Sequence, residues 1–382
     1  ENFDRLAAES ILFDRAYSLA EDLESSYDRL FSNAAGSETW LTAIRDAGIE
    51  TTFLADRESR LDSPSVSDFD QVRPIFAKPL DRLANRVSQT ESARYFASAL
   101  NWVEQMPDGS LGWFDCSGLA GQWDAPYELR QKLAIEDDPD PPEFYQPPHF
   151  WFNVATDDPD VLLGLQHALT AQVQMLDQFV GILLDVLDEP RFHSTMFCLV
   201  SPRGYPLGEH GVIGQPADPS AGSTAPALKN NFNESLHVPM MVRLPKTEFP
   251  ECCLIRSGRI VLPSDLIPLI RAFLTDDDPG VDAWVKNFAQ TLPQIDREVV
   301  VVDNDPEVSI QTHAWKLIQN IRTGDCQLFA KPDDLWEVND VSSRCPHVLA
   351  SLQKLLLEIQ SNPEIINDPS FQLPAELITG HR

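Results

Sequence analysis

The sequence predicts an α/β fold in which a sheet is covered by helices on both faces, followed by a smaller α+β subdomain. Helical periodicity alternates with short apolar runs along the first two thirds of the chain, a pattern typical of α/β proteins. After residue 275 the pattern changes to several strand-like runs that precede one amphipathic helix. We therefore expect an α/β domain over residues 1–275, an α+β subdomain over 276–360 and an irregular tail over 361–382.

The expected elements follow from apolar spacing and from turn residues. Phe3, Leu6 and Ile11 have helical spacing and open the chain, and the longest helix is expected to end before Pro190. Buried strands are recognised as short apolar runs bounded by turn residues. The further helices are expected at 39–47, 91–105, 160–187 and 346–360, and the strands at 51–55, 111–117, 195–201, 299–302, 309–318 and 326–330.

Composition limits the possible functions. The chain has 382 residues, 43% of them hydrophobic, so it can bury a large core. It carries 29 basic and 59 acidic residues, a net charge of −30, and clustered cations for nucleic-acid binding are absent from the sequence. No apolar run approaches the roughly 20 residues that a membrane span needs. The six cysteines form no Cys-x-x-Cys pair and are expected to be free thiols, which favours a cytoplasmic location.

Short motifs along most of the chain carry a family resemblance. The clearest is 200–211, which reads Val-Ser-Pro-Arg-Gly-Tyr-Pro-Leu-Gly-Glu-His-Gly. Other matching segments follow the same order as in the family: 1–10, 13–18, 47–51, 172–187, 234–239, 262–268 and 334–340. Together they resemble the sulfatase family of the alkaline phosphatase superfamily. The resemblance implies a mixed sheet between helices, with the family's first strand absent from this chain, and a final strand at 334–340.

The resemblance also implies where the family's catalytic groups would lie. Active sulfatases use formylglycine, made from cysteine, with an arginine and two lysines around the anion and with carboxylates around calcium. The corresponding positions hold Leu23 for the nucleophile, Tyr27 for the arginine, Asp56 for the first lysine, and Pro202 and Arg203 for two metal ligands. Leucine cannot become formylglycine, proline has no side-chain ligand, and arginine is a permanent cation. No metal or other cofactor is therefore expected.

Ser25, Ser26 and His210 are candidates for a catalytic role. Ser25 and Ser26 flank the lost nucleophile position, and related phosphatases use a metal-activated serine or threonine there, although a serine without metal ligands is a weak nucleophile. His210 could act as an acid or a base. We prefer a loop-ordering role for it, because no nucleophile adjoins it in the sequence.

An anion site is a further hypothesis. Lys229 occupies the position of the second anion-binding lysine, and Arg203 and Arg45 could contribute charge to the same cleft. The substitutions together favour a catalytically inactive pseudo-sulfatase that binds an unknown ligand or partner protein. The alternative is a sulfuric or phosphoric ester hydrolase with a rearranged site, and calcium is expected only in that case.

Overall fold

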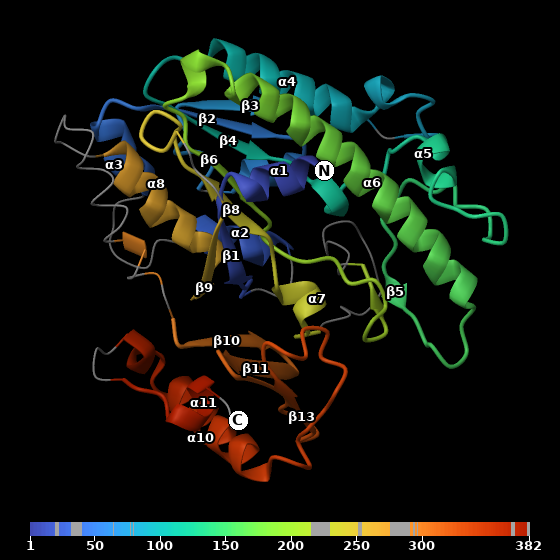
Figure 1. Ribbon diagram of the computed structural model, residues 1–382, viewed down its shortest axis with the longest axis vertical. Coiled ribbons are helices and arrows are strands. Elements are labelled where there is room, and N and C mark those ends of the chain that lie inside the picture. The colour runs from blue at the N-terminus through green and yellow to red at the C-terminus, as the bar shows by residue number, and fades with distance from the viewer. Residues whose placement is uncertain are drawn as a thin grey trace.

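The computed structural model describes residues 1–19, 23–31, 40–63, 65–76, 78, 80–214, 230–250, 254–275, 291, 292, 295, 297–367 and 371–379. Helices cover both sides of the strands in the larger part of the molecule, and the C-terminal strands and helices form a separate layer pair beside it (Figure 1). The predicted α/β fold with a mixed sheet is confirmed. Within the described ranges, no helix is both long and apolar enough to cross a membrane.

The strands of the larger part form two sheets rather than one. The first is parallel, in the order β3 (Gln71–Pro74), β2 (Glu50–Ala55), β4 (Ser110–Asp115). The second is mixed, in the order β6 (Phe197–Val200), β8 (Met240–Arg243), β1 (Ile11–Ala16), β9 (Ile255–Val261). β1 is parallel to β9 and antiparallel to β8, which is antiparallel to β6. Strands β5 (Phe150–Trp151) and β7 (Val212–Ile213) form a short separate ribbon.

Two helical layers enclose both sheets. One layer consists of α1 (Asn2–Ala8), α4 (Glu91–Gln105) and α6 (Pro159–Leu187), and the other of α2 (Leu23–Phe31), α3 (Trp40–Asp46) and α8 (Leu266–Leu274). Neighbouring residues of β2 point to opposite layers, because Leu54 packs with Trp102 of α4 while Phe53 packs with Trp40 of α3. The layers therefore follow the period of two that a strand imposes on its side chains. Two short helices, α5 (Tyr127–Gln131) and α7 (Asn233–Leu236), lie outside these layers.

Local sequence explains where the longest helix begins and how closely the layers approach. Asp158 caps α6 by accepting a hydrogen bond from the amide of Asp160, and Pro159 supplies the fixed φ that suits a first helical residue. The predicted helix at 160–187 is thus confirmed. Gly112 of β4 is required by packing, since a Cβ atom there would lie 2.4 Å from the ring of Trp102.

Ile11 and the segment 309–318 do not form the elements expected of them. Ile11 lies in β1 rather than in the opening helix, because the chain leaves α1 after Ala8 and Ile11 and Phe13 then alternate toward the core. The expected strand at 309–318 is two strands, β11 (Glu307–Thr312) and β12 (Trp315–Asn320), joined by a tight turn that contains neither glycine nor proline.

The C-terminal part is an antiparallel sheet covered by helices. Its strands run in the order β10 (Val299–Asn304), β11, β12, β13 (Cys326–Ala330), and α10 (Pro346–Ser361) packs over them through Leu352 and Leu356. The expected boundary at residue 276 opens the segment 276–290, outside the described residues. The tail is not irregular throughout: it contains α11 (Ala375–Thr379), whose Leu377 is fully buried in this core.

Candidate functional site

A buried cluster occupies the carboxyl ends of β2 and β4. We call it the strand-end cluster, and it consists of Tyr27, Arg57, Arg60 and Asp115. The Tyr27 hydroxyl donates to Oδ1 of Asp115 at 3.0 Å, and Nε of Arg60 donates to Oδ2 at 2.9 Å. The guanidinium of Arg60 lies 3.7 Å from the centre of the Tyr27 ring, a cation–π contact. Nη2 of Arg57 lies 3.7 Å from Oδ1 of Asp115.

Arg60 and Asp115 form a buried ion pair in this cluster. The side chains of Arg60 and Asp115 are 1% and 0% exposed, so both charges have been removed from water. Burial, and then the charge of Asp115, raises the pKa of Tyr27 well above its ordinary value, so the phenol stays protonated and serves as a hydrogen-bond donor. Both oxygens of the Asp115 carboxylate accept hydrogen bonds, one from Tyr27 and one from Arg60.

The other residues predicted around the nucleophile position lie on α2 and after β2. Leu23 is the first residue of α2. On the same helix Ser26 is buried, with its Oγ 3.4 Å from Oγ of Ser18, and Ser25 is half-buried. Asp56, after β2, accepts hydrogen bonds from the amide and the hydroxyl of Ser117 and so fixes the turn that follows β4. Burial, opposed by these hydrogen bonds, raises the pKa of Asp56.

The segment at the family's metal position packs against α7. The Ser201 hydroxyl donates to the carbonyl of Arg203 at 2.6 Å, and the amide of Gly204 donates to the carbonyl of Ser235 at 2.9 Å. Arg203 is 4% exposed, and Pro202 precedes it in this turn. A proline and a guanidinium do not fit calcium, which prefers oxygen ligands. Within the described ranges, no three His, Cys, Asp or Glu side chains are placed to hold a metal ion.

The hypothetical anion site is only partly described. Lys229 lies outside the described residues. Arg45 is exposed in the last turn of α3, whereas Arg203 is buried. The combination of these cations therefore stays a prediction.

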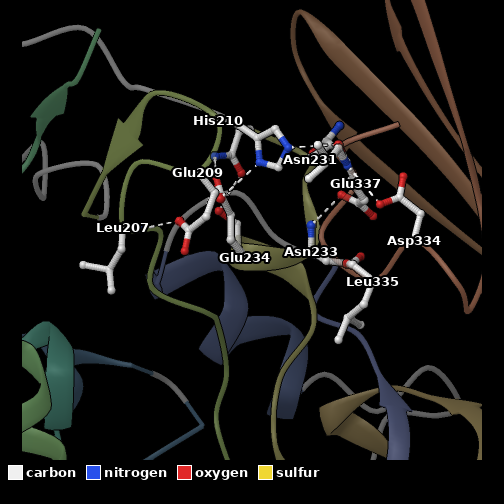
Figure 2. Close-up of polar contacts among 12 residues, drawn as sticks. Leu207, Glu209, His210, Asn231, Asn233, Glu234, Asp334, Leu335 and Glu337 are labelled. Carbon is white, nitrogen blue, oxygen red and sulfur yellow. Dashed lines mark hydrogen bonds and ion pairs between the residues drawn. The ribbon is translucent and has the colours of Figure 1, made fainter. Parts of the chain in front are cut away.

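His210 belongs to a second polar cluster, between the α/β part and the C-terminal sheet (Figure 2). Its Nδ1 lies 3.1 Å from Oε2 of Glu234, and its Nε2 lies 3.1 Å from the carbonyl oxygen of Glu337. The imidazole stacks on Phe232, with ring centres 3.5 Å apart and planes at 6°. This geometry suits the loop-ordering role, since both ring nitrogens and one ring face have partners.

Glu337 connects His210 to two buried lysines. Its Oε1 lies 2.9 Å from Nζ of Lys316 and 2.7 Å from Nζ of Lys331, and its Oε2 accepts from the amide of Asn233 at 2.8 Å. Nζ of Lys316 also donates to Oδ1 of Asn233 at 2.9 Å. Burial lowers the pKa of Lys316 to about 8, against the opposing charge of Glu337. We call His210, Asn233, Glu234, Lys316, Lys331 and Glu337 the junction cluster.

Sequence reasoning missed both clusters except for Tyr27 and His210. Lys316 carried a usable signal, because a lysine inside an apolar strand pattern requires a buried counter-charge. The expected final strand at 334–340 is wrong: the segment forms turns, with Glu337 at a φ of 56°, and so directs the Glu337 carboxylate at the lysines.

The junction cluster predicts a pH dependence of stability. Burial alone would lower the pKa of His210, but the hydrogen bond and charge of Glu234 raise it above its ordinary value, because two acceptors favour an imidazolium with two donors. A raised folded-state pKa contributes stability that is complete below the unfolded value of about 6.5 and is lost as pH rises through the folded value.

We therefore expect the free energy of unfolding of the wild type, measured relative to that of His210→Gln, to fall as the pH is raised. The fall should amount to up to about 1 kcal/mol between about pH 6 and pH 7.5. Urea unfolding at both pH values measures the difference. The exposed His347, replaced in the same way, is the matched control. An unchanged wild-type-minus-variant difference would contradict the pairing.

The fold can be compared with known proteins. No family model matches the sequence, and no curated protein is significantly similar to it. Solved structures match over nearly the whole chain. One is a protein described in complex with its substrate D-glucosamine-2-N,6-O-disulfate, with a TM-score of 0.65, 15% identity and 94% and 92% of the two chains covered. Another, described as a 2-O GAG sulfatase, has a TM-score of 0.64, 13% identity and coverage of 98% and 89%.

The similar structures include an enzyme that is not described as a sulfatase. The phosphonate monoester hydrolase of Agrobacterium radiobacter has a TM-score of 0.61, 12% identity and coverage of 94% and 90%. The chain therefore has the fold that these sulfatases and phosphonate monoester hydrolases share, and its motifs predicted the sulfatase fold.

Proposed function

We propose that this chain is a catalytically inactive, sulfatase-like protein that binds a ligand or a partner protein. The strand-end cluster is the observation that carries the proposal. Tyr27 stands at the family's arginine position, and its hydroxyl holds Asp115 together with the buried Arg60. Asp115 and Arg60 neutralise each other, so this buried pair offers neither a free base nor an open cation to a substrate.

The surrounding residues support the same conclusion. Ester hydrolysis requires a nucleophile and fixed positive charge near the developing anion. Leu23 has no nucleophilic atom, and Asp56 places a carboxyl group where an anion-binding lysine would act. The four described cysteines, Cys116, Cys198, Cys326 and Cys345, are free, which supports a cytoplasmic location as part of this proposal.

A turnover assay tests the proposal. Aryl sulfate and aryl phosphate esters, with and without added calcium, are expected to be hydrolysed no faster by the protein than by buffer. An active sulfatase assayed in parallel is the positive control. Turnover that Ser25→Ala or Ser26→Ala abolishes would overturn the proposal and favour a hydrolase with a rearranged site.

Introducing a cysteine at the nucleophile position alone is expected to give no sulfatase activity. Leu23→Cys, expressed together with a formylglycine-generating enzyme, should show no sulfatase activity, because Tyr27, Pro202 and Arg203 still occupy the positions of the arginine and the metal ligands. Mass spectrometry of the peptide that spans the substituted position shows whether formylglycine forms, and aryl sulfate hydrolysis measures activity. Hydrolysis by the converted variant would mean that the remaining residues still bind and activate the ester.

A further inference from the structure

A cavity lies beside the ends of α1 and β8. Its volume is about 180 Å³, and its lining comprises Glu9, Arg243, Leu244, Lys246, Phe249 and Pro250. Pro250 is exposed and Lys246 is half-buried, so the cavity reaches the surface of the protein. It is at the opposite end of β1 from the strand-end cluster, because Glu9 precedes β1, whereas Ser18 follows it and contacts α2, the helix of Tyr27.

The guanidinium group of Arg243 in this lining has incomplete hydrogen bonding. Its side chain is 5% exposed. In the part of the chain that the structure describes, its acceptors contact Nη2 alone: they are Asp188, and Glu9 at 2.9 Å. Nε is buried without an acceptor there, and Nη1 has none either. Because a buried donor without an acceptor costs free energy, an acceptor bound in the cavity would stabilise Arg243.

Three cations share two carboxylates beside the cavity. Glu9 and Asp188 each lie within 4.0 Å of the same three side chains, which are Arg5, Arg243 and Lys246. A third carboxylate, Asp185, contacts Arg5 but is 71% exposed, so water screens its charge. Nζ of Lys246 has three donors, and its close contact is with Asp188 at 2.7 Å. One positive charge therefore remains in excess next to the cavity.

The rest of the lining is apolar and limits the size of a ligand. Leu244, Phe249 and Pro250 offer no charge, so an inorganic anion would leave this part of the cavity unfilled. An engineered apolar cavity of about 150 Å³ in another protein holds benzene, so the present cavity is large enough for a ring of that size.

We propose that this cavity binds a small organic carboxylate whose apolar body is no larger than about one benzene ring. The carboxylate accepts hydrogen bonds from Arg243 and Lys246, and the apolar body contacts Leu244 and Phe249. Its single negative charge balances the cation in excess. The site does not depend on whether the chain is catalytically inactive, so the turnover assay and the following titration can fail separately.

Titration calorimetry with benzoate, near pH 7 and at low ionic strength, tests the site. Benzoate should bind saturably with a Kd of about 1 mM or below. Two matched compounds separate the contributions: benzamide has the ring without the charge, and acetate has the charge without the ring. Both should bind at least about tenfold more weakly than benzoate. Inorganic phosphate should also bind more weakly, because it cannot contact the apolar lining.

Variants with opposite expected effects place benzoate in the cavity. Lys246→Gln should weaken binding about fivefold or more, because one charged donor is lost. Glu9→Gln should tighten binding about threefold or more, because a carboxylate that competes for Arg243 is removed. Lys354→Gln, which removes an exposed lysine of α10, is the matched control and should leave binding unchanged. Circular dichroism shows whether each variant is folded.

Several results would overturn the proposal. One is the absence of saturable benzoate binding below about 10 mM. Others are equal affinities for benzoate and benzamide, tighter binding of phosphate than of benzoate, or benzoate binding that Lys246→Gln and Lys354→Gln weaken alike. Weaker binding to folded Glu9→Gln would also contradict the site, since a loss of packing cannot explain the expected gain in affinity.

Discussion

Glu337→Gln is expected to destabilise the protein by about 3–5 kcal/mol near pH 7, the cost of removing one partner from a buried ion pair. The side chains of Glu337 and Lys316 are 0% and 1% exposed, and Lys331 reaches the same carboxylate. A glutamine retains the shape of glutamate but not its charge, so two buried ammonium groups lose their counter-ion. Urea unfolding followed by tryptophan fluorescence measures the loss in the free energy of unfolding.

The same variant has a predictable response to alkaline pH. A lysine whose folded-state pKa is lowered to about 8 favours the folded state once it is neutral, so its contribution is complete above about 10.5 and is lost as pH falls through 8. The penalty for removing Glu337 should therefore shrink between pH 7 and pH 10, because neutral lysines need no counter-ion. Asp305→Asn, which breaks the exposed pair with Arg322, is the control and should cost less than about 1 kcal/mol. A loss below about 1 kcal/mol for Glu337→Gln, or equal losses at both pH values, would contradict this account.

Asp115→Asn is expected to cost a similar 3–5 kcal/mol, because it removes the carboxylate that faces the buried Arg60. Asparagine can still accept the hydrogen bond from Tyr27, so the loss reports mainly the charge. Unlike lysine, arginine does not deprotonate in a protein, and the penalty should persist from pH 7 to pH 10. Chemical unfolding at both pH values checks this contrast with Glu337→Gln.

A second substitution separates charge from packing in the strand-end cluster. Arg60→Met in the Asp115→Asn background should recover part of the lost stability, because the buried cation is then gone as well. Asp14→Asn, whose partner Arg256 is 65% exposed, is the matched control and should change stability by less than about 1 kcal/mol. Additive losses in the double variant would show that Asp115 and Arg60 do not stabilise the fold as a pair.

Local sequence predicted the helices and the overall fold better than it predicted the turns. The helix at 160–187 was predictable because a long apolar stripe and a capping aspartate agree. The turn between β11 and β12 was not, since His313 and Ala314 carry no turn signal. Ile11 continued a helical spacing by coincidence, and only its pairing with β8 and β9 makes it a strand residue.

The polar clusters were harder to predict because their members come from distant segments. Tyr27 lies 88 residues before Asp115, and His210 lies 127 residues before Glu337. Motif positions located Tyr27 and His210, but no periodicity relates either residue to its partner. The resemblance to sulfatases predicts which family positions hold a different residue in this chain, whereas the partners of those residues can be read only from the packed structure.

The position of β1 has a consequence for how the chain folds during synthesis. β1 pairs with β8 and β9, and Ile11 is opposite both Val242 and Ile255. At ribosomal rates, roughly 240 further residues take about 10–50 s to emerge, so an apolar strand made early waits that long for its neighbours. The pairing of β1 with β8 and β9 therefore forms late in synthesis. A chain released before β9 is made leaves one edge of β1 unpaired, and that edge can associate with other chains.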